Sequence, residues 1–136
     1  MNNSVDFIEK DELNKIKSAV SKNAFVAEIN GEEIQSWADY WNAVSSSFSF
    51  PVLPSYLKSD YHTYYDLMTD LSWIKEDSII LIVANANDFL KDDLQLKTSI
   101  IKDFQEYLLP FWDNEIVDTV VGGKKRNFTV YFVKED

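Results

Sequence analysis

The six-residue run SIILIV, at positions 78–83, constrains the fold of this chain more than any other feature. A strand with one face in water alternates apolar and polar residues, whereas this run has no polar residue after Ser78. Branched aliphatic residues without alternation are typical of a strand covered on both faces in a parallel sheet. Parallel neighbours need a long crossover, usually a helix. The run therefore predicts an α/β fold with helices packed on the sheet.

Two other segments have strand character. FVAEI, at 25–29, is stopped by the turn pair Asn30-Gly31, and FTVYFV occupies 128–133. Together with the central run they predict a small, mainly parallel, three-stranded sheet. The stretch Ile116–Val121 is a weaker strand candidate, hairpinned to the last strand through Gly122-Gly123.

Helix signals fill the intervals between these strands. Ser36, with Asp39 three residues later, is a capping box that opens a helix. Apolar residues follow it at helical spacing and predict a core-facing stripe: Trp37, Tyr40, Trp41, Val44 and Phe48. Asp60 is the expected N-cap of a second helix that runs to Leu71, and a third begins at Thr98 and is ended or kinked by Pro110.

The first residues of the chain form a separate pattern. Leu13, Ile16 and Val20 recur at i, i+3 and i+7, which predicts an amphipathic helix added to the domain. We therefore expect an N-terminal helical extension over 1–23 and one α/β domain over 24–136. The polar, acidic start does not resemble a signal peptide, so we expect a cytoplasmic protein.

Charge limits the partners. Acids outnumber bases by 23 to 13, for a net charge of −10, and up to Lys22 four acids balance four lysines. The rest of the chain thus carries the whole negative field, which repels nucleic acid and anionic membranes and attracts basic proteins. Plain solubility is the simpler interpretation of the same acidity.

Catalytic and cofactor signatures are missing from the sequence. There is no cysteine and only one histidine, His62, so thiol chemistry and multi-histidine metal centres are excluded. No phosphate-binding glycine loop or nucleophile elbow occurs. We therefore expect no cofactor, no metal and no enzymatic activity.

Four features in one order resemble the barstar family of ribonuclease inhibitors. They are INGEEIQSWADY at 29–40, a helix ending in FSFP at 48–51, YYDLMTDL at 64–71, and the hydrophobic strand that follows. The resemblance runs from about Phe25 to Val133 and implies a barstar-like fold. It also implies an intracellular inhibitor that blocks a basic ribonuclease without reacting with it.

The resemblance implies a binding surface on the loop and helix that precede the central strand. In the family an aspartate after an aromatic residue enters the enzyme's active site in place of a substrate phosphate, and Asp66 after Tyr65 matches it. Thr69, Tyr56 and Glu106 match a further threonine, a loop tyrosine and an acid of the last helix. Three neighbouring residues complete the expected surface: Asp60, His62 and Asp70.

Three positions depart from the family pattern. Lys58 and Asp60 replace a glycine and an asparagine before the helix, and His62 replaces a second aspartate. About three extra residues follow Pro51. The sequence thus predicts a monomeric inhibitor, or immunity protein, of a basic ribonuclease or ribonuclease-type toxin. The alternative is a non-inhibitory acidic module that binds another basic protein.

Overall fold

The sheet has four parallel strands in the order β1-β4-β3-β2. The computed structural model describes residues 3–20, 22–116 and 123–134. The strands are β1 (Ser4–Glu9), β2 (Ala24–Asn30), β3 (Ser78–Ala84) and β4 (Asn127–Lys134). The helices are α1 (Lys10–Ala19), α2 (Trp37–Ser47), α3 (Tyr61–Met68) and α4 (Leu94–Asp103).

The central run is a strand of the sheet's interior, as predicted. β3 pairs in parallel with β2 on one side and with β4 on the other. Its side chains alternate between two hydrophobic cores. Ile79, Leu81 and Val83 belong to the larger core and Ile82 to the smaller one. Because both faces are covered, the run needs no polar alternation.

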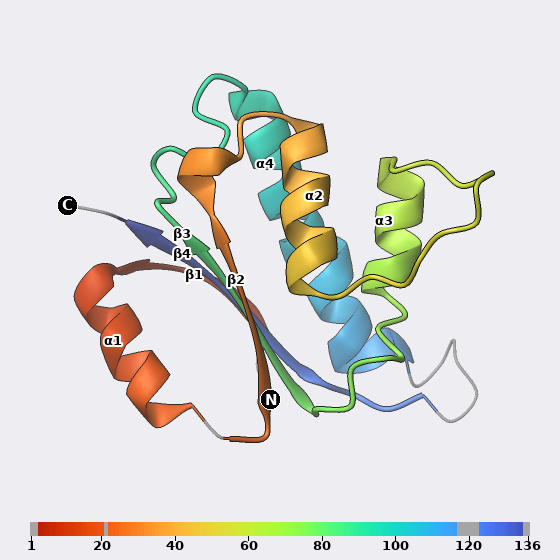
Figure 1. Cartoon of the computed structure of the whole chain (residues 1–136). Helices are drawn as coiled ribbons and strands as arrows, with labels where there is room; N and C mark the ends of the chain where they lie inside the picture. Colours follow the sequence, from red (N-terminus) through yellow and green to blue (C-terminus); the bar gives the residue numbers. More distant parts are fainter. Residues whose placement is uncertain (1–2, 21, 117–122, 135–136) are drawn as a thin grey trace.

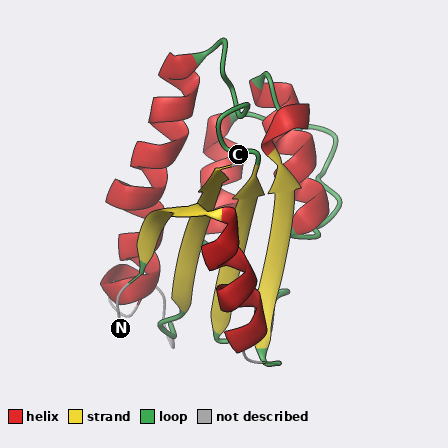
Figure 2. Ribbon diagram, turned by 90° about the vertical axis from the view of Figure 1, so that its left-hand side faces the viewer, coloured by secondary structure: helices red, strands yellow, loops and turns green. Residues whose placement is uncertain are grey.

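The helices are divided unequally between the two faces of the sheet. In Figure 1, α2, α3 and α4 lie on one side of the strands and α1 lies alone on the other. Figure 2 shows α1 in front of the sheet. Leu13 of α1 is buried in the smaller core, and the Nζ atom of Lys17 lies 3.0 Å from Glu28 Oε1 on β2. The fold is therefore a three-layer α/β sandwich with one thin layer.

The expectation of three strands is wrong, because the N-terminal segment contributes a fourth. The predicted helix with buried Leu13 is present over Lys10–Ala19, but a strand, Ser4–Glu9, precedes it. This strand pairs with β4, more than 120 residues away in the sequence. It lies at the sheet's edge, where a short strand with mixed polarity is tolerated. The division into 1–23 and 24–136 remains a prediction.

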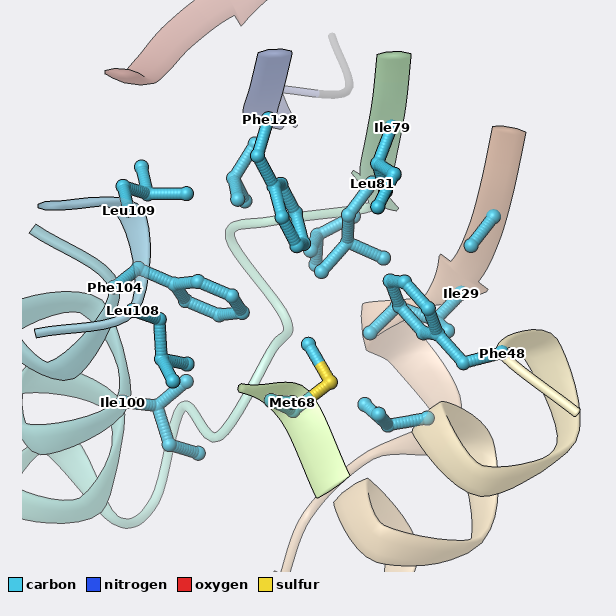
Figure 3. Close-up of a cluster of buried hydrophobic side chains, with 14 of the residues drawn as sticks. Ile29, Phe48, Met68, Ile79, Leu81, Ile100, Phe104, Leu108, Leu109 and Phe128 are labelled. Atoms are coloured by element: carbon cyan, nitrogen blue, oxygen red, sulfur yellow. The ribbon is translucent and has the colours of Figure 1, made fainter. Parts of the chain in front are cut away.

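The larger core lies between the sheet and α2, α3 and α4. Figure 3 shows Phe48, the residue after α2, and Met68, at the end of α3, reaching toward Leu81 and Phe128 of the sheet. Of the predicted stripe, Tyr40, Val44 and Phe48 are buried, and Trp37 and Trp41 are half-buried against the core. Ile80 of β3 points to the opposite face of the sheet, where it is partly buried against the smaller core.

Helix starts follow their predicted caps more closely than helix ends do. Ser36 accepts the backbone N–H of Asp39, and Asp60 accepts that of Thr63. The third helix begins at Leu94 rather than Thr98, because Asp93 caps it by accepting the Leu96 N–H. The second helix ends at Met68, before the predicted Leu71.

Pro110 neither ends nor breaks the last helix. The chain stays helical from Leu94 to Ile116, with π-helical turns at Phe104–Leu108 and Phe111–Glu115. In such a turn the backbone N–H of one residue donates to the carbonyl five positions earlier, as the Leu109 N–H does to the Phe104 carbonyl. Pro110 lies between these two irregular turns, where its missing N–H is tolerated. Ile116 is therefore helical, and the rest of the strand candidate 116–121 lies outside the described residues.

Removing the Ser36 cap should cost stability. Ser36→Ala leaves the Asp39 N–H without its acceptor, so we expect a loss of about 1 kcal/mol in the free energy of unfolding. Urea unfolding measures this loss from the shift in midpoint. Ser46→Ala, at an exposed position of the same helix, is the matched control, and an equal loss there would contradict the capping role.

The INGE motif forms a junction between two strand ends. Asn30 Oδ1 accepts the backbone N–H of Glu32 and the side-chain N–H of Asn85, which follows β3. A Cβ atom on Gly31 would lie 2.5 Å from the Asn85 carbonyl oxygen and 2.8 Å from that of Ala84. Only glycine fits so close to this backbone. The INGE motif, which carries much of the resemblance, therefore has a role in the fold.

Candidate functional site

Helix α3 is held to the core on one side only. Tyr64 and Met68 are buried, and the hydroxyl oxygens of Tyr40 and Tyr64 lie 2.7 Å apart in a hydrogen bond. The Trp112 indole N–H donates to the Met68 carbonyl at 3.0 Å. These contacts fix the rotation of the helix and turn its opposite side outward.

The outward side chains of this helix and its two ends form what we call the α3 face: Asp60, His62, Tyr65, Asp66, Thr69 and Asp70. Asp66 is 65% exposed and His62 is 88% exposed, and the distance from His62 Nε2 to Asp66 Oδ2 is 3.7 Å. Solvated pairs of this kind contribute little energy. The Asp66 carboxylate is therefore available to a partner.

Two members of the α3 face already have structural roles. Asp60 caps the helix at 3.0 Å from the Thr63 nitrogen, and this backbone hydrogen bond lowers the pKa of the carboxyl group. At the other end, the Thr69 hydroxyl donates to the Tyr65 carbonyl at 2.8 Å. Both residues stabilise the helix that presents Asp66, whatever else they contact.

Asp70 and Tyr56 lie at the margins of this surface. Asp70 is exposed and lines a hollow of about 320 Å³ together with three basic residues, Lys75, Lys124 and Arg126. Lys124 is already paired with Asp77 at 2.8 Å, so Lys75 and Arg126 are the cations that reduce the negative field at this end of α3. Tyr56 is 80% exposed in the loop before α3, so its ring is free to contact another molecule.

Glu106 is exposed on the π-helical turn Phe104–Leu108. The neighbouring Tyr107 meets α3. It lines a hollow of about 200 Å³ with Tyr61, His62 and Tyr65. The sequence analysis missed Tyr61 and Tyr107. The i, i+4 spacing of Tyr61 and Tyr65 is the signal that places those two rings together.

Comparison with known protein families shows which family the chain belongs to. The family model described as Barstar (barnase inhibitor) matches residues 24–132. The chain belongs to the barstar family. Among curated proteins, none matches it.

The barstar match runs from the first residue of β2 into β4 and includes α3 and the last helix. It confirms the resemblance drawn from the sequence motifs. All eight residues predicted to bind a partner fall inside it, and their roles in binding stay predictions. Strand β1 and helix α1 lie outside the match.

Within the barstar-like region, Asp103 is a buried acid that the sequence analysis did not select. Its side chain is only 6% exposed, and one oxygen accepts the Tyr61 hydroxyl at 2.5 Å. The other oxygen, Oδ2, has no hydrogen-bond partner among the described residues. Burial raises the pKa of Asp103, and the hydrogen bond from Tyr61 opposes that rise.

Asp103 should make stability depend on pH. Its pKa is higher in the folded state than in the unfolded chain, so folding favours the protonated form. We expect the free energy of unfolding of the wild type to rise relative to Asp103→Asn as pH falls from about 7 toward about 4, near the ordinary aspartate pKa. Thermal melts of both proteins across this window measure the difference. A constant or opposite difference would contradict the prediction.

Other kinds of site have little support in the described part of the chain. It contains no group of three or more histidine, cysteine or acidic side chains placed to hold a metal ion. None of its helices is long and apolar enough to cross a membrane.

Proposed function

We propose that this protein inhibits a basic ribonuclease, or a ribonuclease-type toxin, by covering the enzyme's active site with the α3 face and Tyr56. It would act in the cytoplasm as the immunity protein of a cell that makes the enzyme. Asp66 is the proposed central contact, and no bond is made or broken.

The observation that carries the proposal is the presentation of Asp66. Its carboxylate is two-thirds exposed and has only a weak solvated partner, while the other side of its helix is locked by Tyr64 and Met68. A ribonuclease site is lined with cations that hold phosphate, and a rigidly held carboxylate pairs with such cations through strong hydrogen bonds. Because the helix is already ordered, little conformational entropy is lost on binding.

The direct test is inhibition of RNA cleavage. Barnase, the enzyme in the family's description, and any basic nuclease encoded beside this gene are titrated with the protein, and residual activity is measured. We expect activity to fall to zero at one equivalent for the cognate enzyme. Failure against every such nuclease would contradict the proposal.

Association with the ribonuclease should be steered by charge. The net charge of −10 attracts a basic enzyme over distances that added salt screens. We expect the association rate to fall roughly tenfold or more between about 0.02 and 0.5 M salt, a general range of which barnase and barstar are themselves an example. Stopped-flow mixing measures the rate, and the dissociation rate should change much less. A salt-independent association rate would rule steering out.

The second candidate function is a non-inhibitory module that binds a different basic protein. His62 and Lys58 favour it, since both replace the family's usual residues on the proposed surface. Binding without loss of nuclease activity distinguishes the two functions. A partner that is not a nuclease supports the module.

A further inference from the structure

A cleft next to the α3 face has an unusual combination of walls. It has a volume of about 390 Å³ and lies between α2, the start of α3, and α4. Most of the side chains that line it are aromatic or aliphatic: Trp37, Tyr61, Tyr64, Leu96 and Ile100. Two are acids, the buried Asp103 and the exposed helix cap Asp60. We call it the Asp103 cleft. Its volume falls in the range of small-ligand sites.

The carboxylate in this wall is incompletely paired. Asp103 is 94% buried; Tyr61 satisfies one oxygen and Oδ2 has no partner among the described residues. The Tyr40 and Tyr64 hydroxyls are close by but bond to each other. A buried carboxylate without a counter-charge is costly. The cleft therefore has, in Oδ2, a hydrogen-bond acceptor that no group of the described residues uses.

We propose that the Asp103 cleft binds an organic cation, an ammonium or guanidinium group on a short apolar stem. The charged group would pair with Asp103, and the rings of Trp37 and Tyr61 would add cation–π attraction. The stem would lie against Leu96 and Ile100. Oδ2 is buried in the structure, so a lining side chain must shift to admit the cation, and Tyr61 is the most exposed of the aromatic ones.

Titration of the isolated protein with 2-phenylethylammonium tests this proposal. The probe has the required charge and stem, and 2-phenylethanol is its neutral analogue. Binding is followed by NMR at the Trp37 indole N–H, which donates to the Ser59 carbonyl at the rim, and at the Ser99 amide. We expect saturable shifts with the amine and at least tenfold weaker binding of the alcohol.

Variants separate the cleft from the α3 face. Asp103→Asn should weaken amine binding at least tenfold, and its fold is checked by a thermal melt. Asp66→Ala, an acid of the same type on the neighbouring surface, should leave amine binding unchanged within twofold. No saturable shift, or equal binding of amine and alcohol to the wild type, would overturn the proposal even if Asp103→Asn failed to fold.

The cation has two sources, a free small molecule or a basic side chain of the protein partner. Repeating the titration on the complex with the inhibited ribonuclease distinguishes them. Competition assigns the cleft to the partner's side chain, and independent binding assigns it to a free amine. Only the titration of the complex rests on the proposed function. If the protein inhibits no ribonuclease, the titration of the isolated protein still tests whether the Asp103 cleft binds a cation.

Discussion

Asp66→Ala is expected to weaken binding of the inhibited ribonuclease by roughly 2–5 kcal/mol. The substitution would leave a cation of the enzyme buried and unpaired, and the range is the general one for buried charge pairs, to which barnase and barstar themselves contributed. Because Asp66 is 65% exposed and its side chain makes one long, solvated contact with His62, the free energy of unfolding should change by about 0.5 kcal/mol or less. Inhibition titrations and thermal melts measure the two quantities.

The control for this variant must be an acid without a structural role. Asp93 is unsuitable because it caps α4, whereas Asp92 beside it is exposed and in the described chain has no side-chain hydrogen bond or ion pair. Asp92→Ala removes the same charge and should weaken binding by less than about 1 kcal/mol. Equal and small losses for both variants would show that Asp66 is not the central contact.

Gly31→Ala is expected to destabilise the fold by about 3 kcal/mol. The added Cβ would meet the carbonyl oxygens of Asn85 and Ala84 at 2.5 and 2.8 Å, distances at which backbone must move. Those atoms lie at the carboxyl end of β3, in the middle of the sheet, so the strain cannot be relieved by turning a side chain. The urea midpoint should fall with an unchanged slope.

Glu32→Ala, one residue further on, is the matched control. Its side chain is exposed, so the free energy of unfolding should change by about 0.5 kcal/mol or less. A Gly31→Ala protein as stable as this control would mean that the two strand ends are not packed as closely as the structure has them.

Helical spacing predicted which residues of the candidate site share a face of one helix, but not which residues meet from different helices. Spacing places Tyr64 and Met68 opposite Asp66 on the same helix, so the outward position of Asp66 followed from the sequence. The position of Tyr107 beside α3 could not be predicted in this way, because it depends on how the last helix lies against α3. Asp103 follows buried Ile100 by three residues, and only contact with Tyr61 from another helix explains a carboxylate there.

Sequence alone determined the elements whose causes are local. The unbroken run of β3 predicted its burial on both faces, and Ser36 and Asp60 predicted their helix starts, because capping and alternation involve only neighbouring residues. Tertiary structure decided the fourth strand, the passage of the helix through Pro110 and the burial of the Asp103 carboxyl group. Each of these depends on partners far away in the chain, such as β4 for β1, and no local pattern encodes which distant segments will meet.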